Sequence, residues 1–185
     1  RPKALITIGY IDERGDDHVV VNGIRLTSRV LRVNLDAAHR VFAYVATAGT
    51  EIEQWAYARN DILERYWADG IMLMAVRSAV AYMSAYIHEH YRPGQVSRMN
   101  PGSLPDWPLH EQRALFSLVG DVWASVGVRL TDSYLTVPRK SVSGIFFPTE
   151  ENFESCQLCG RELCPGRRAP YDPTLFDRKY RLASP

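Results

Sequence analysis

The residues best suited to chemistry in this sequence are its three cysteines, which lie in one short segment near the C-terminus. Cys156, Cys159 and Cys164 form a C-x2-C-x4-C motif. Two thiolates with this tight spacing can reach one metal ion from a single turn, and the third can return to it after a short loop. The motif therefore predicts either a zinc ion or iron–sulfur cluster whose remaining ligand comes from elsewhere or from a partner, or three free thiols in an exposed loop. The candidate fourth ligands in the chain are His18, His39, His88, His90, His110 and Asp172.

A second candidate site is the loop RMNPGSLPDW, which begins at Arg98. Its prolines hold the chain open, and Gly102 permits close approach of a ligand to the backbone. The Arg98 guanidinium suits a bidentate contact with a carboxylate, while backbone groups beside it suit an amine or an adenine edge. The alternative is purely structural: Arg98 is a surface charge, and Asp106 caps a helix that opens at Pro108.

The composition is that of an ordinary soluble globular protein. Apolar residues make up 46% of the 185 residues and charged residues 23%. The 22 Lys and Arg nearly balance the 21 Asp and Glu, which argues against a nucleic-acid-binding protein that relies on bulk charge. An odd number of clustered cysteines fits a reducing compartment and metal ligation better than a disulfide framework, so we expect a cytoplasmic protein.

Turn residues and hydrophobic patterning predict the elements of the first half of the chain. Asn22-Gly23 indicates a hairpin turn, and residues 40–48 read as a strand. A capping box at Thr50 and Glu53 predicts a helix that runs to about residue 67 and is broken at Asp69-Gly70.

The next helix, over residues 71–91, is apolar or small on nearly every face and is expected to be the buried central helix. It carries Arg77 near its middle. A charge at that position would make a membrane span costly, so we expect no membrane.

The second half predicts one more helix and two strands. The helix should run from Pro108 to Ser125, with an apolar stripe of Leu115, Leu118, Val119 and Val122. The strands should cover residues 128–137 and 141–148, the latter with a glycine bulge at Gly144. These elements favour an α+β fold with a twisted antiparallel sheet and two or three long helices.

The stretch GVRLTDSYLTVPRKSVSG, from Gly127 to Gly144, resembles the activation domain of cobalamin-dependent methionine synthase. The upstream loop is similar too, because that family has an arginine followed by a PG step, matched here by Arg98 and Pro101-Gly102. The segments DWPLHEQ and KSVSGI and the closing cysteine motif with RRAPYD resemble stand-alone relatives of that domain found near corrinoid methyltransferases. The cysteine cluster is absent from the methionine synthase domain itself.

The resemblance implies a fold and a ligand. Residues 1–153 would form the activation-domain-like α+β domain, and residues 154–185 a cysteine-containing extension packed on it. Domains of this family bind S-adenosylmethionine (AdoMet). Carried over, Arg98 would hold the AdoMet carboxylate, and its amino-acid end would be lined by Asn100, Pro101, Gly102 and Ser103, the last of which replaces a tyrosine of the family.

The resemblance also implies a partner, because the family docks on a corrinoid domain whose oxidised cobalt is then reduced and remethylated. The chain shows no corrinoid-binding D-x-H-x-x-G motif, nucleophile or acid–base pair. We therefore expect an accessory protein that binds AdoMet, docks on a separate corrinoid protein or corrinoid-dependent methyltransferase and supports reactivation of its cobalamin. An electron donor would be a further partner. The alternative is an iron–sulfur or zinc-binding redox or scaffold module of the same system that does not bind AdoMet.

Overall fold

The computed structural model describes residues 1–181 and is built on one large twisted antiparallel sheet with helices on both faces, beside a small two-stranded sheet. The large sheet has six strands in the order β3-β2-β1-β4-β8-β5. The strands are β1 (Lys3–Arg14), β2 (His18–Val21), β3 (Ile24–Thr27), β4 (Arg40–Thr47), β8 (Ser141–Pro148) and β5 (Val96–Met99). The helices are α1 (Arg29–Asn34), α2 (Thr50–Tyr57), α3 (Ile62–Tyr91), α4 (Gln112–Val119) and α5 (Val122–Val126), with short single turns at Leu109–Glu111, Ser155–Leu158 and Phe176–Tyr180.

Strand β4 is the centre of the fold, since it pairs with β1 on one side and β8 on the other. Successive side chains of a strand point to opposite faces, and here both faces are buried. One face presents Val41, Ala43 and Val45 to the main core, which also holds buried residues of α1, α4 and α5. The other face presents Phe42, Tyr44 and Ala46 to α3.

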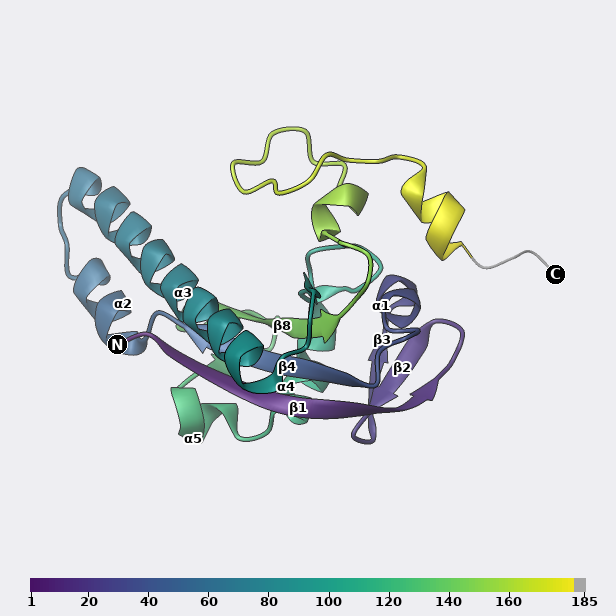
Figure 1. Cartoon of the computed structure of the whole chain (residues 1–185). Helices are drawn as coiled ribbons and strands as arrows, with labels where there is room; N and C mark the ends of the chain where they lie inside the picture. The colour runs from purple at the N-terminus through teal and green to yellow at the C-terminus, as the bar shows by residue number, and fades with distance from the viewer. Residues whose placement is uncertain (182–185) are drawn as a thin grey trace.

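Two layers of helix result, as Figure 1 shows: α3 crosses one face of the sheet and α5 lies against the opposite face. The C-terminal segment arches over the same side of the sheet as α3. Phe153 and Tyr180, near the two ends of this segment, are both buried in the main core. Residues 182–185, the end of the expected extension, lie outside the described residues.

Several predicted elements are confirmed. The strand of residues 40–48 is β4, and the strand of residues 141–148 is β8. The hairpin turn lies between β2 and β3, with positive φ at both Asn22 and Gly23. The residues of the predicted stripe, Leu115, Leu118, Val119 and Val122, are all buried.

The predicted boundaries of the first long helix are wrong. The capping box does not form, because Gly49 is the N-cap residue of α2 and no side chain caps it. Helix α2 ends at Tyr57, and α3 begins after Asp61, whose carboxylate accepts hydrogen bonds from two backbone N–H groups. Helix α3 then continues through Gly70, because one glycine inside a long helix costs only about 1 kcal/mol and does not by itself end it.

The expected burial of the apolar helix is also wrong. Helix α3 buries a single stripe, made of Ala68, Met72, Val76, Ala79, Met83 and Ile87. Many of its other apolar side chains, and those of α2, are exposed: Trp55, Tyr57, Ile62, Leu63, Tyr66, Trp67, Ile71, Met74 and Tyr82. By length and composition alone α3 passes as a membrane span, which is weak evidence because core helices pass the same test. Of its most apolar window, 28% is buried.

The second half of the chain departs from prediction at two places. The helix expected from Pro108 to Ser125 is interrupted at Gly120, whose φ of 103° lies outside the helical region. The strand expected over residues 128–137 is mostly a turn, flanked by two-residue strands β6 (Arg129–Leu130) and β7 (Thr136–Val137). Within residues 1–181, α3 is therefore the one long helix, where two or three were expected.

Gly144 lies in a regular strand without the predicted bulge, since its register with β4 is continuous. Its lack of a side chain is needed for another reason. An added Cβ would lie 3.0 Å from the Tyr44 hydroxyl and closer still to the Asn100 amide nitrogen and the Met99 carbonyl oxygen. Gly144 therefore lets the end of β5 approach β8 and β4 closely.

We predict that Gly144→Ala destabilises the protein by about 1–3 kcal/mol, because the added methyl group displaces backbone and a hydrogen-bonded amide. Chemical denaturation measures the free energy of unfolding. Gly166→Ala is the matched control, since no atom lies within 4 Å of its added Cβ. Equal stability of the two variants would contradict the close approach at Gly144.

We predict that Gly70→Ala stabilises the protein by about 0.5–1 kcal/mol, because alanine is the better residue inside a helix and the added Cβ meets no atom within 4 Å. Thermal and urea unfolding would show the gain. A loss of stability would mean that the chain breaks at Gly70, as the sequence alone suggests.

Candidate functional site

A cleft of about 720 Å³ opens between α3, the sheet edge formed by β8 and β5, and the C-terminal segment. Its floor is polar and comes from β8 and the loop after β5, whereas its α3 wall is largely apolar. The α3 residues in the lining are Leu73, Val76, Arg77, Val80, Ala81 and Ser84. The remaining lining residues are Arg98, Asn100, Pro101, Gly102, Ser103, Leu109, Gln112, Thr136, Ser141, Val142, Ser143, Phe146 and Arg168. All five residues predicted to contact AdoMet thus line one cleft.

The loop after β5 is a tight turn closed by its own backbone. The Gly102 N–H donates to the Trp107 carbonyl at 2.7 Å, and the Ser103 N–H donates to the Asn100 carbonyl at 3.1 Å. Gly102 has a φ of 82°, and a Cβ there would lie 2.9 Å from the Leu109 side chain. These two N–H groups are therefore already used, and the other polar groups of the lining residues Pro101, Gly102 and Ser103 are two carbonyl oxygens and a hydroxyl.

The side chain of Asn100 joins the loop to the sheet. Its amide nitrogen donates to the Tyr44 hydroxyl at 2.8 Å and to the Ser143 carbonyl at 2.6 Å. The Ser143 hydroxyl donates to the Gln112 side-chain oxygen at 2.8 Å, and the Gln112 amide nitrogen donates to the Tyr134 carbonyl at 3.1 Å. This chain of hydrogen bonds fixes the polar floor of the cleft.

Arg98 lies on β5 opposite Phe146 of β8, and its guanidinium carbon is 5.8 Å from the centre of the Phe146 ring. No carboxylate within residues 1–181 forms an ion pair with it. Burial raises the pKa of the Tyr44 phenol, and the Arg98 charge opposes that rise. The Arg98 guanidinium therefore has its charge available to an anionic ligand.

The structural alternative for Asp106 is wrong, because this carboxylate does not cap the helix after Pro108. It accepts hydrogen bonds from the Arg29 and Val30 N–H groups at 3.2 and 3.0 Å and from the Ser28 hydroxyl. Asp106 thus ties the end of the loop to the start of α1.

Arg168 closes the cleft from the C-terminal segment. Its guanidinium pairs with Glu154 at 2.7 Å. Its backbone N–H lies 3.4 Å from the Cys156 sulfur. Glu154 in turn forms a backbone bridge with Arg98. Arg168 therefore joins the cleft wall to the cysteine loop.

The side chain of Arg167 holds the cysteine loop together through hydrogen bonds to its backbone. Arg167 donates to the Cys156 carbonyl at 3.2 Å, to the Cys159 carbonyl at 3.3 Å and to the Arg161 carbonyl. The three cysteines are half-buried free thiols. In the described part of the chain, no three His, Cys, Asp or Glu side chains are arranged to hold a metal ion. The candidate ligand Asp172 instead bonds Thr174 and pairs with Arg178 at 3.1 Å.

Sequence reasoning missed four residues of the site: Tyr44, Arg77, Gln112 and Arg168. Tyr44 and Gln112 are buried inside ordinary strand and helix patterns, so no local signal marks them. Arg77 did carry a signal, because a lone charge in the middle of an apolar helix must face either water or a ligand. Arg168 lies in a basic stretch near the C-terminus, a pattern that usually indicates a solvated surface.

No protein-family profile and no curated protein matches this chain. Among solved structures, 13 chains match. One is a crystal structure described as the MetH reactivation domain bound to AdoHcy, with a TM-score of 0.66 and 16% sequence identity. The match covers 83% of this chain and 60% of that one, so this chain spans less than two thirds of that structure. At this identity the likeness establishes the fold: an α+β domain whose twisted antiparallel sheet and long helix are similar to those of the MetH reactivation domain.

Proposed function

We propose that this protein binds AdoMet, or its demethylated form S-adenosylhomocysteine (AdoHcy), in the cleft beside Arg98. It would serve a separate corrinoid protein or corrinoid-dependent methyltransferase whose cobalamin it helps to reactivate. The observation that carries the proposal is the unpaired guanidinium of Arg98 beside a loop of carbonyl acceptors, in a fold similar to a domain solved with AdoHcy.

The amino-acid end of such a ligand fits the polar floor. Arg98 would donate two hydrogen bonds to the carboxylate, a contact that a planar guanidinium makes well. The α-ammonium group needs acceptors. The turn would supply the carbonyl oxygens of Pro101 and Gly102, since the Asn100 carbonyl already accepts from the Ser103 N–H. Ser103 adds a hydroxyl at the cleft rim.

The adenosine end fits the apolar wall. Leu73, Val76 and Val80 of α3 and Val142 of β8 supply apolar lining to the cleft. Sites for ligands of this size have volumes of roughly 300–1,000 Å³ and are lined mainly by apolar groups. The volume of about 720 Å³ therefore accommodates the whole ligand.

The corrinoid partner is supported by the fold alone. AdoMet, when bound, would supply a methyl group, and the residues of this chain would hold and orient it. The part of the chain that the structure describes places no nucleophile and base together in the cleft, so the acceptor of the methyl group would come from the partner.

We predict that Arg98→Ala lowers the affinity for AdoHcy by at least about tenfold, because a charge-assisted bidentate contact contributes about 1.5–3 kcal/mol. Calorimetric titration of the purified protein measures this change. The control Arg25→Ala removes an exposed arginine of β3, outside the cleft, and should bind like the parent. If Arg98→Ala also binds like the parent, the assigned carboxylate contact is wrong.

The second candidate function rests on the cysteines. We carry the iron–sulfur or zinc hypothesis as a separate prediction, because one N–H group already points at the Cys156 sulfur and Arg167 holds the loop closed. As described, the loop does not gather three ligands, so no step of the proposed function passes through a metal.

Metal and sulfide analysis of protein purified without oxygen tests this second hypothesis. It predicts iron with matching sulfide, or zinc, in the parent protein and loss of the metal in Cys156→Ser. The Arg98→Ala variant should keep the metal content of the parent, because Arg98 lies outside the motif. A parent protein without metal would leave the cysteines as free thiols.

A further inference from the structure

The cleft has an unbalanced charge. Three guanidinium groups line it, from Arg77, Arg98 and Arg168. Among the lining residues of the described chain there is no Asp or Glu. A lining with one sign of charge raises the local concentration of ligands of the opposite sign and repels those of the same sign.

The carboxylates near the cleft are held by other groups. Glu154 pairs with Arg168 at 2.7 Å, and Asp69 of α3 pairs with Lys140 at 2.9 Å. Glu53 accepts a hydrogen bond from the Arg139 N–H at 2.6 Å. Each of these carboxylates already has a partner, and none is among the residues that line the cleft.

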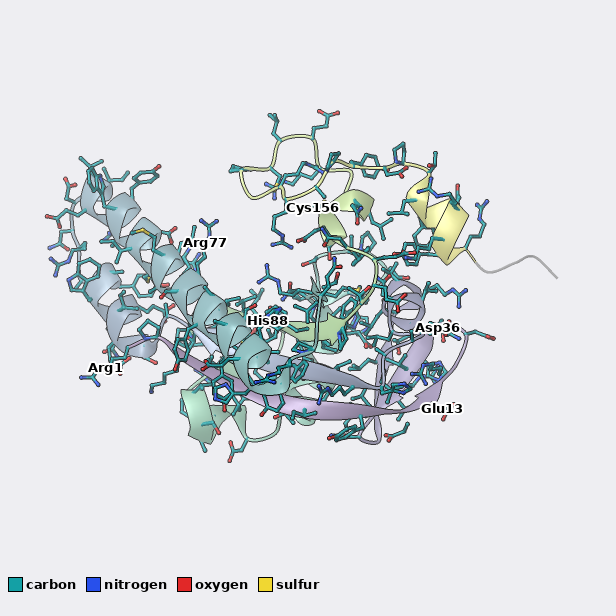
Figure 2. All side chains as sticks on the ribbon, viewed as in Figure 1. Arg1, Glu13, Asp36, Arg77, His88 and Cys156 are labelled. Carbon is teal, nitrogen blue, oxygen red and sulfur yellow. The ribbon has the colours of Figure 1, made fainter. Side chains whose placement is uncertain are left out.

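Of the three guanidinium groups that line the cleft, that of Arg77 has no negatively charged partner in the residues described. Glu154 offsets Arg168, and the ligand carboxylate would offset Arg98. Arg77 is exposed on α3 and forms no ion pair with any carboxylate of residues 1–181. Figure 2 shows its side chain on the side of α3 that faces the segment carrying Cys156. A positive charge therefore stands over the apolar wall without a partner.

The two forms of the ligand differ at one atom. AdoMet has a methylated, permanently positive sulfur, whereas AdoHcy has a neutral thioether and is otherwise identical. We propose that the charge of this cleft selects the neutral form, so that AdoHcy binds more tightly than AdoMet. This inference rests on the proposed function, and it makes the demethylated ligand a competitor of the methyl donor.

Calorimetric titration of the full chain with three ligands tests the selection. AdoHcy should bind about tenfold more tightly than AdoMet, the size of one repulsion between partly screened charges. Sinefungin, which carries a protonated amine in place of the sulfur group, should bind as weakly as AdoMet. The preference should shrink as salt is added, since screening weakens repulsion between exposed charges.

Variants of Arg77 identify the charge responsible. Arg77→Gln should bring the two affinities close together, and Arg77→Glu should make AdoMet the tighter ligand. Arg65→Gln, on the same helix but outside the cleft, should keep the preference of the parent. Thermal unfolding checks that each variant is folded.

The outcomes separate this inference from the proposed function. If AdoMet binds as tightly as AdoHcy or more tightly, the charge selection is wrong and the proposed ligand class stands. If the preference survives in Arg77→Gln and Arg77→Glu, its assignment to Arg77 is wrong. If neither ligand binds, the proposed function fails and this inference falls with it.

Discussion

The site depends on the close approach of the β5 end to β8. Only a glycine at position 144 allows it, because the Asn100 amide occupies the space of a Cβ. In that position Asn100 bonds both the buried Tyr44 hydroxyl and the backbone of the neighbouring strand. The loop that follows is thereby fixed to the central strand of the fold. Arg98 lies two residues before Asn100, on β5, and its guanidinium lies over the Phe146 ring.

The sequence predicts those features that depend on local chemistry. The strands β4 and β8 follow from their β-branched and aromatic runs, and the β2–β3 hairpin follows from Asn22-Gly23. The arginine, the first proline and the glycine that mark the loop after β5 in the sequence, Arg98, Pro101 and Gly102, all line the cleft. Residues that act through tertiary contact gave no such signal. Gln112, for example, reads as one polar residue at the start of a helix, although it is buried and bonded to Ser143.

Helix α3 shows why an apolar pattern can mislead. A helix that is apolar all round is expected to be buried, yet α3 packs through a single stripe onto the sheet and α2. The predicted start of α3 is wrong because a tertiary contact again overrides the local pattern. Asp69-Gly70 reads as a break, but Asp69 is held by Lys140 next to β8, and Gly70 has open space around it. The contact with Lys140 lies 71 residues away in the chain, beyond the reach of local patterns.

The cysteine loop and the ligand cleft share one short path through the structure. Arg98 bridges to Glu154, Glu154 pairs with Arg168, and the Arg168 backbone points at the Cys156 sulfur. Arg167 meanwhile holds the carbonyls of the same cysteine loop. A change of charge at Cys156, whether by deprotonation or ligation, therefore acts directly on the residue that closes the cleft. Glu154 bridges to Arg98 through the backbone, while its carboxylate pairs with Arg168 and not with the Arg98 guanidinium. The C-terminal segment thus takes part in the cleft through the charged pair of Arg168 and Glu154.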